Sequence, residues 1–508
     1  MFRKKSLREK SPDIMRVVSP PINIPTGLPP EPSAKPQVAV FVTHGMGQQV
    51  PFETLDAAAE GLIQSANRHG NSINEIRSRT VLIGDIKTQR AEFEMRDAQD
   101  RDVEVHVYEG YWAPITEGQV TLRDVMLFLF RAGLKGLWNS WFNFERWMFG
   151  KGVSFGQQNG ATFHLLIPLA VLLSLLGLNS VIAFVAANKL FHKECVINCA
   201  SNLSDPNFVA LTNLAAIYLA ICLVCGGTLL LLMLFKKGIK NPGTNAGWHF
   251  ATRVGEIMLW LWVLCTIVCG TWMLSIYSFC LKPKCLDFTC ISNLWPAVWT
   301  ILVFASWLVK NLLIQYMGDV AAYVDSHSLD KFDDVRSRIK ATVFEHAKAI
   351  YANSQYEHIA MMGHSLGSAI TYDTLNALIN NDALNGNKLD VIKRTKLLLT
   401  FGSPLDKFAF LFASQINKAT ATREALAATL QPLIQAYLPF RNIKWINVYS
   451  DRDIVSGRLD FYDDEEAAGY TTERKVKNVE DPDAKIPLAA HIEYWDNRKL
   501  FDELFENL

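Results

Sequence analysis

A glycine-flanked turn is the feature that most restricts the fold of this chain. Residues 358–370 read HIAMMGHSLGSAI, an apolar run followed by GHSLG at 363–367 and then by small residues that can open a helix. A strand that turns this sharply into a helix leaves no room for a Cβ where Gly363 and Gly367 stand. The pattern predicts a buried strand, a tight turn that presents the Ser365 hydroxyl, and a helix. Because such a pentapeptide also arises by chance, its meaning depends on the rest of the chain.

A histidine is the second requirement. A serine hydroxyl becomes an effective nucleophile when a histidine accepts its proton and a carboxylate orients that histidine. Where the serine lies on a strand-to-helix turn of this type, the acid and then the histidine follow it in the chain. Of the eleven histidines, His491 alone lies after Ser365, in LAAHIEYWDN. We therefore predict that His491 is the general base, and a surface histidine without a catalytic role is the alternative.

The acid has three candidates. The stretch 442–455 reads NIKWINVYSDRDIV, an alternating strand pattern that ends in two aspartates. Carboxylates that follow a strand lie in the loops above a sheet, where catalytic groups are commonly placed. We choose Asp453 over Asp451, because the Ile-Val pair that follows Asp453 can tuck under the sheet edge and fix its carboxylate. Asp406, in TFGSPLDKF, is the third candidate, and an aspartate that merely begins a turn is the alternative for each.

A glycine loop near the start of the chain is the candidate for the oxyanion site. Residues 37–47 read QVAVFVTHGMG, a buried-strand pattern that runs into a turn. The residues of that turn are His44, Gly45, Met46 and Gly47. A tetrahedral intermediate needs backbone N–H groups aimed at its developing negative charge. We predict that Met46 gives one such N–H group and that Leu366, the residue after the serine, gives the other.

These segments occur in a recognisable order. HGMG, GHSLG, FGSPLD, YSDRDIV and AAHIEYW follow the order of an α/β-hydrolase, and the chain resembles the lipase and esterase branch of that superfamily over residues 37–115 and 318–500. The resemblance implies an α/β fold with a mostly parallel sheet and helices on both faces, a Ser365-Asp453-His491 triad and an acyl-enzyme mechanism. Related lipases often carry Asp-Pro-Val at the acid, whereas this chain has Asp-Ile-Val. The residues that support the motifs are His44, Gly45, Gly47, Gly363, His364 and Gly367.

Four long uncharged segments separate the two hydrolase portions. Residues 163–187, 211–235 and 257–281 are each 25 long, 291–309 is 19 long, and none contains Asp, Glu, Lys or Arg. About 20 apolar residues span a bilayer core, so these segments predict an all-α transmembrane domain of four helices. Four crossings return the chain to its original side, which agrees with the requirement that both hydrolase portions form one site.

The basic residues beside these segments predict an orientation. Those on the hydrolase side are Arg146, Lys151, Lys236, Lys237, Lys240, Arg253 and Lys310, whereas those of the opposite loops are Lys189, Lys193, Lys282 and Lys284. By the positive-inside rule, the hydrolase is expected on the cytoplasmic face of a multi-pass membrane protein. The cysteines in or beside the opposite loops are Cys195, Cys199, Cys280, Cys285 and Cys290. Such clusters are typical of oxidising compartments, and we predict at least one disulfide among them.

The predicted domain order has five parts. Residues 1–36 form a flexible, basic and proline-rich tail, and 37–120 form the first part of the hydrolase. Residues 121–160 form an interfacial segment, in which tryptophans and basic residues at helical spacing predict an amphipathic helix at the membrane surface or, alternatively, one packed on the hydrolase. Residues 161–317 form the transmembrane domain, and 318–508 the second part of the hydrolase.

Composition excludes several other functions. The 50 basic and 50 acidic residues leave no net charge, so nucleic-acid binding has no electrostatic support. No dinucleotide or Walker fingerprint is present, and we expect no cofactor and no metal. The predicted function is a membrane-embedded serine hydrolase that cleaves an acyl ester, with a lipid as the expected substrate because the site lies beside a bilayer. The alternatives are a thioesterase or acyltransferase at the same site, and a membrane transport or scaffold protein with a regulatory hydrolase-like module.

Overall fold

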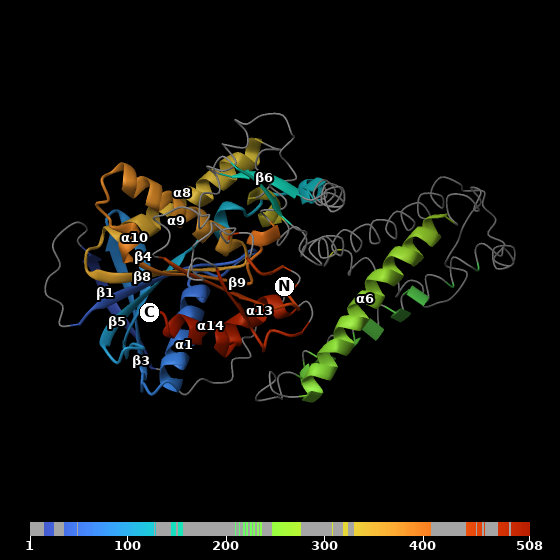
Figure 1. Cartoon of the computed structure of the whole chain (residues 1–508), viewed down its shortest axis with the longest axis horizontal. Coiled ribbons are helices and arrows are strands. Elements are labelled where there is room, and N and C mark those ends of the chain that lie inside the picture. The colour runs from blue at the N-terminus through green and yellow to red at the C-terminus, as the bar shows by residue number, and fades with distance from the viewer. Residues whose placement is uncertain are drawn as a thin grey trace, which may run out of the picture.

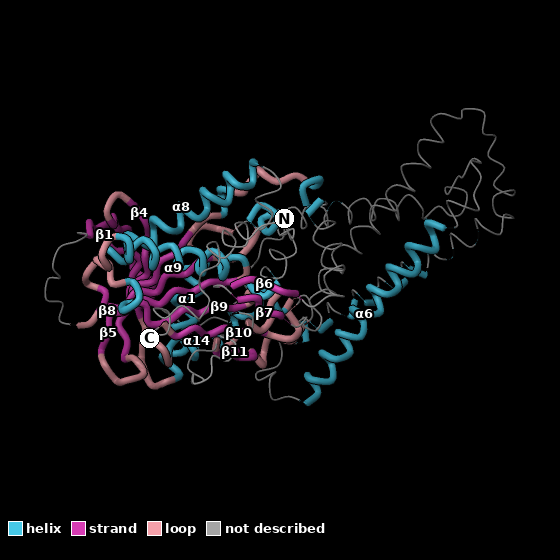
Figure 2. The backbone as a smooth tube through the Cα atoms, turned by 45° about the horizontal axis from the view of Figure 1, so that its top comes forward, coloured by secondary structure: helices cyan, strands magenta, loops and turns pink. Residues whose placement is uncertain are grey.

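The fold is known from a computed structural model of residues 1–508. It describes residues 15–24, 35–47, 49–125, 127–128, 144–148, 151–155, 246–275, 318–323, 330–407, 443–453, 455–459, 462, 476–486 and 489–508, with single positions between 209 and 235 and residue 307. Figure 1 and Figure 2 show a layered α/β body built from strands and helices of both the N-terminal and the C-terminal part of the chain.

The body is built on one nine-stranded sheet with the order β1-β3-β4-β5-β2-β8-β9-β10-β11. Its strands are β1 (Met15–Ile24), β2 (Gln37–Thr43), β3 (Glu75–Ile83), β4 (Ile86–Arg96), β5 (Asp102–Gly110), β8 (Tyr356–His364), β9 (Thr395–Phe401), β10 (Lys444–Tyr449) and β11 (Lys477–Glu480). All neighbours pair in parallel except β4, which is antiparallel to both β3 and β5. The sheet is therefore mixed and mostly parallel, which agrees with the α/β sheet that the resemblance implies.

Helices cover both faces of the sheet. On one face lie α8 (Asp330–Ala352) and α9 (Leu366–Leu384), and on the other lie α1 (Glu53–Arg68) and α14 (Arg498–Phe505), as Figure 1 shows. Shorter helices are η1 (Ala113–Ile115), α10 (Val391–Arg394), α13 (Ala490–Glu493) and η8 (Tyr494–Asp496).

The central strands are apolar on both sides because both sides are covered. In β2, Ala39 and Phe41 belong to the core under α8 and α9, whereas Val38, Val40 and Val42 belong to the core under α1 and α14. This two-sided burial explains why the strand reads as a continuous apolar run.

The position of β2 determines where a site can form. After β2 the chain passes through α1 and builds β3, β4 and β5 on one side, whereas β8 to β11 add one after another on the other side. The loops that follow β2 and β8 therefore leave the sheet in opposite directions, and ligands of α/β sheets bind at the carboxyl ends of strands at such a point.

The predicted flexible tail contains a strand. β1 pairs in parallel with β3 at the edge of the sheet, with a register shift between Ser19 and Ile22. Pro20 and Pro21 lie in that shift. Proline cannot donate to a strand ladder, but it is tolerated at an edge or an irregularity, which is why a proline-rich segment can pair here.

The predicted interfacial helix is also wrong over part of its length. Residues 144–148 form strand β6 (Phe144–Met148), which pairs in antiparallel fashion with β7 (Lys151–Phe155). Aromatic residues favour strands as well as membrane interfaces, so spacing alone does not separate the two. Residues 131–143 lie outside the described part of the chain.

The predicted transmembrane domain is corrected by the structure. Among the residues that the structure describes, no helix is long and apolar enough to cross a membrane. This finding contradicts the four-helix transmembrane part of the predicted fold and the multi-pass localisation. A run without charge shows that a segment is apolar, but it does not specify the environment in which the segment folds.

The individual predicted spans differ in how much of them is described. Residues 163–187 lie outside the described part, as do 291–309 except for residue 307, and 211–235 is described at single positions. Residues 257–275 belong to α6 (Ala246–Ser275), which extends away from the sheet in both Figure 1 and Figure 2.

Helix α6 contacts the C-terminal part of the chain near its first turns. In the first turns of α6, Ala251 packs against a cluster of Leu232, Ile486 and Ala489. This contact connects α6 to the chain just before α13. The cysteines of the predicted disulfide lie outside the described residues.

Candidate active site

The turn between β8 and α9 has the conformation that the glycine pattern requires. β8 ends at His364, α9 begins at Leu366, and Ser365 between them has φ 52° and ψ −127°. A residue other than glycine rarely adopts a positive φ, and strain of this kind concentrates at functional sites. The serine is therefore held in a conformation that the surrounding structure must enforce.

The two flanking glycines permit this turn because their neighbours are too close for a side chain. A Cβ on Gly363 would lie 2.6 Å from the carbonyl oxygen of Gly367. A Cβ on Gly367 would lie 2.3 Å from the carbonyl oxygen of His44, in the loop that follows β2. The second contact also shows that the turn and the glycine loop are packed against each other, although about 320 residues separate them.

The structure brings together the three residues that the sequence predicts as a triad. Nε2 of His491, in α13, lies 2.8 Å from Oγ of Ser365, and Nδ1 of His491 lies 2.9 Å from Oδ2 of Asp453. An ionised carboxylate can only accept, so Nδ1 carries the proton and donates to Asp453. Nε2 is then the free acceptor for the Ser365 hydroxyl proton, as a general base must be.

Asp453 is held ionised by its surroundings. Burial alone would raise its pKa, but the neighbouring His491 and the backbone N–H of Val455 lower the pKa of Asp453 to about 2. The Val455 N–H donates to Oδ1 at 2.8 Å, and the Tyr494 hydroxyl donates to Oδ2 at 3.0 Å. Three donors thus fix the carboxylate that orients His491.

The two alternative acids lie elsewhere. Asp451 is exposed at the end of β10. Asp406 is fully buried, which raises its pKa, and its Oδ2 lies 3.3 Å from Nζ of Lys407. Lys407 also donates to the carbonyl oxygen of Ser456 at 2.9 Å, so this pair supports the loop that carries Asp453. Among the three predicted acids, Asp453 is the one that hydrogen-bonds His491.

Tyr494 is a part of the site that the sequence analysis did not identify. Its hydroxyl bridges Asp453 and the Ser456 hydroxyl, which lies 2.9 Å away. Tyr494 stands three residues after His491, and residues three apart in a helical turn lie on the same face. The spacing of three residues could therefore have indicated that Tyr494 lies beside His491, because α13 continues directly into η8.

The loop after β2 is organised by a neutral histidine. Nε2 of His44 accepts from the backbone N–H groups of Trp112 at 3.0 Å and Ala113 at 3.3 Å, so Nδ1 must donate to the carbonyl oxygen of Gly45 at 2.8 Å. Burial lowers the pKa of His44 to about 4. This imidazole is therefore uncharged and supports the loop rather than acting as a base.

The predicted oxyanion donors lie on the two elements beside Ser365. Gly45 approaches so closely that a Cβ on it would lie 2.9 Å from the Cβ of Ser365, and Met46 follows it in the buried part of the loop. Leu366 is the first residue of α9, and the first N–H groups of a helix have no intrahelical acceptor. The positive end of the helix dipole is therefore directed at the serine.

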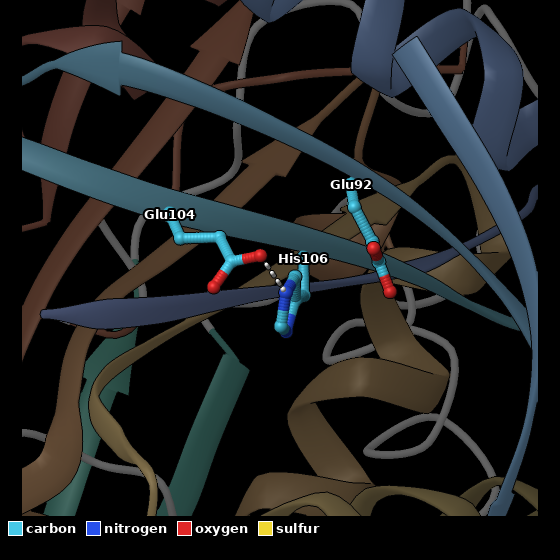
Figure 3. A group of neighbouring side chains, drawn as sticks. All are labelled: Glu92, Glu104 and His106. Carbon is cyan, nitrogen blue, oxygen red and sulfur yellow. Dashed lines mark ion pairs between the residues drawn. The ribbon is translucent and has the colours of Figure 1, made fainter. Parts of the chain in front are cut away.

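A second cluster of ionisable residues lies away from this site. Figure 3 shows Glu92, Glu104 and His106, whose potential ligand atoms lie within 4.8 Å of one another. Nε of Arg90 lies 2.6 Å from Glu92, and Nδ1 of His106 lies 2.9 Å from the Tyr356 hydroxyl. A guanidinium at this distance is already paired with the Glu92 carboxylate, and its positive charge would repel a metal cation. We interpret the cluster as an ionic network that joins β4, β5 and β8.

The chain matches no protein-family model, no curated protein and no solved structure. Its resemblance to α/β-hydrolases therefore stays a prediction, and the chemistry of the site rests on its own residues.

Proposed function

We propose that the protein is a serine hydrolase that cleaves an acyl ester through a covalent acyl-enzyme intermediate. The observation that carries the proposal is the continuous hydrogen-bonded chain from Ser365 Oγ through His491 to Asp453, with distances of 2.8 and 2.9 Å. The partners and the orientation of the three side chains are those that nucleophilic catalysis requires.

In the first half of the reaction, Ser365 Oγ attacks the ester carbonyl carbon while Nε2 of His491 accepts the hydroxyl proton. The negative charge that develops on the carbonyl oxygen is stabilised by the N–H groups of Met46 and Leu366. Asp453 stabilises the imidazolium of His491. The tetrahedral intermediate then collapses, and His491 gives its proton to the departing alcohol, which leaves the acyl group on Ser365.

In the second half, water takes the place of the alcohol. His491 accepts a proton from the water as its oxygen attacks the acyl carbon, and the same two N–H groups stabilise the second oxyanion. Collapse of this intermediate returns the proton from His491 to Ser365 Oγ and releases the carboxylic acid. The helix dipole of α9 favours the negative charge in both steps.

The substrate class follows from the chemistry of the site. The sequence predicts a lipid ester because it places the site beside transmembrane helices, whereas no helix among the described residues is long and apolar enough to cross a membrane. The triad itself supports an acyl ester as the substrate class. A panel of p-nitrophenyl esters with acyl chains from acetate to palmitate, assayed with the full chain, measures the preferred length.

The decisive experiment is labelling with a fluorophosphonate, which reacts with activated serines. Wild type should be labelled, and Ser365→Ala should not. Ser65→Ala is the matched control, because Ser65 is also buried but lies near the C-terminal end of α1, where it hydrogen-bonds Asp502 of α14. Wild-type protein that is folded by circular dichroism and yet unlabelled would defeat the proposal, as would equal labelling of Ser365→Ala.

A further inference from the structure

A buried carboxylate holds the glycine loop from outside the predicted triad. The backbone N–H of Gly47 donates to Oδ2 of Asp319 at 2.7 Å, a length typical of a charge-assisted hydrogen bond. Asp319 is 7% exposed. Gly47 directly follows Met46, so this bond fixes the loop at the residue beside the proposed oxyanion donor.

The loop needs such a restraint because of its backbone. Gly47 has φ +95°, a conformation that glycine adopts with ease but does not enforce. Further along the loop, the side-chain amide of Gln49 donates to the backbone carbonyl oxygen of Met46 at 3.2 Å. The Tyr111 hydroxyl donates to the backbone carbonyl oxygen of Gln49 at 2.9 Å. Of these contacts, the Gly47 bond is the one to a charged acceptor.

Asp319 also lies at the base of the long segment that separates the two halves of the sheet. A Cβ on Gly318 would lie 3.3 Å from the Cβ of Val120. Val120 precedes residues 121–317 and Gly318 follows them, so the two ends of this segment lie side by side. The next residue, Asp319, binds the glycine loop.

A second contact holds the same short stretch on the other side. Residues 318–323 are helical, and the Tyr323 hydroxyl donates to Oδ2 of Asp373 in α9 at 2.6 Å. Asp373 also pairs with Lys340 of α8 at 3.3 Å. The stretch is thus attached both to the glycine loop and to the helix that begins after Ser365.

We propose that Asp319 is a positioning residue, which sets the Met46 N–H for the oxyanion and connects the base of the 121–317 segment to the site. The proposal rests on the serine hydrolase function proposed above. Asp319 touches no reacting atom and acts through Gly47. Because displacement of a catalytic group by about 1 Å can cost a hundredfold in rate, a single hydrogen bond is enough for this role.

The test compares Asp319→Ala with wild type on p-nitrophenyl butyrate and with phenylboronic acid. A boronic acid forms a tetrahedral adduct on the serine whose oxygen occupies the oxyanion site, so it reports on that site separately from substrate binding. Asp319→Ala should lower kcat by about 10- to 100-fold and weaken inhibition by the boronic acid by a similar factor, with KM nearly unchanged.

Asp382→Ala is the matched control. Asp382 is also a buried aspartate that accepts backbone N–H groups, those of Leu389 at 2.8 Å and Val391 at 2.9 Å. It lies 17 residues after Ser365 along α9, about 25 Å away. Its loss should lower the unfolding temperature and leave kcat and boronic acid inhibition within about twofold of wild type.

Asp319→Asn keeps the volume of the side chain, and it tests the positioning role if Asp319→Ala does not fold. Its neutral oxygen is a weaker acceptor than a carboxylate, so kcat and boronic acid affinity should fall together by about threefold to tenfold. A folded Asp319→Ala or, failing that, Asp319→Asn with wild-type kcat and boronic acid inhibition would overturn the positioning role. If wild type itself is not labelled at Ser365, the proposed function fails instead.

Discussion

His364 and His491 are stacked, with ring centroids 5.1 Å apart and an angle of 30° between the rings. Nε2 of His364 lies 2.9 Å from the carbonyl oxygen of His491, so His364 must donate to it. The residue before the nucleophile therefore holds both the ring and the backbone of the proposed base. His364, which occupies the variable position before the serine in GHSLG, therefore helps to position His491.

This relationship predicts that His364→Phe impairs catalysis more than binding. A phenyl ring can keep the stacking, but it cannot donate to the His491 carbonyl. The loss of this bond lets α13 shift relative to Ser365, and we expect kcat on p-nitrophenyl butyrate to fall about tenfold with KM nearly unchanged. A variant with wild-type kcat would show that stacking alone positions His491.

The choice among the three acids gives a second prediction. Asp453→Asn should lower kcat by about a thousandfold or more, because the amide favours the wrong tautomer of His491. Asp451→Asn should stay within about twofold of wild type, since Asp451 is exposed and Asp453 is the acid that hydrogen-bonds His491. Steady-state kinetics of the two variants measure the difference. Full activity of Asp453→Asn, or its loss in Asp451→Asn, would reverse the assignment.

The central part of the fold and the site were accessible from the sequence because they depend on short-range requirements. A continuous apolar run indicates a strand buried on both faces, and the glycines at 363 and 367 indicate a turn where backbones approach closely. The order of Ser365, Asp453 and His491 then restricts which residues can meet. Each of these signals is local or depends on chain order alone.

The errors arose where one pattern is compatible with several structures. Absence of charge in 257–281 shows apolar character, which does not specify the environment of a helix. Met148 and Arg146 fit the helical spacing of the predicted interfacial helix, yet both lie in strand β6. Asp319 was missed because its contact with Gly47 joins residues 272 apart in the chain, and no local pattern reveals such a pair.

The packing of the turn predicts that Gly367→Ala displaces Ser365 from the glycine loop and removes its reactivity. The added Cβ would lie 2.3 Å from the His44 carbonyl oxygen, and backbone atoms cannot move aside cheaply. We expect a loss of about 1 to 3 kcal/mol in the free energy of unfolding, together with loss of fluorophosphonate labelling. Urea unfolding and labelling measure the two effects.

Gly227→Ala is the control for this substitution. A Cβ on Gly227 would meet no atom within 4 Å, and alanine favours a helix by up to about 1 kcal/mol over glycine. This variant should therefore keep its labelling and its stability. A Gly367→Ala protein that is labelled as rapidly as wild type would mean that the turn and the glycine loop can separate without loss of function.

Asp319 also predicts a dependence of stability on pH. Burial raises the pKa of Asp319 from 3.8 to about 6, although the Gly47 N–H acts in the opposite direction. Below pH 3.8 the carboxyl is protonated in the folded and the unfolded chain, and it contributes no difference. As the pH rises from 3.8 to 6, the unfolded chain loses the proton first, so folding becomes less favourable by about 3 kcal/mol in total.

Asp319→Asn removes this titration, and we therefore expect it to gain stability relative to wild type between pH 4 and pH 6. Above pH 6 the gain should be constant, because the carboxylate is then ionised in both states of the wild type. Urea unfolding of both proteins at pH 4, 5, 6 and 7.5 measures the difference, in which all other titrating groups cancel to first order. The same substitution should lower kcat, so the charge would decrease stability while it positions the loop. A stability difference that does not change across this range would mean that Asp319 titrates alike in the folded and unfolded chains.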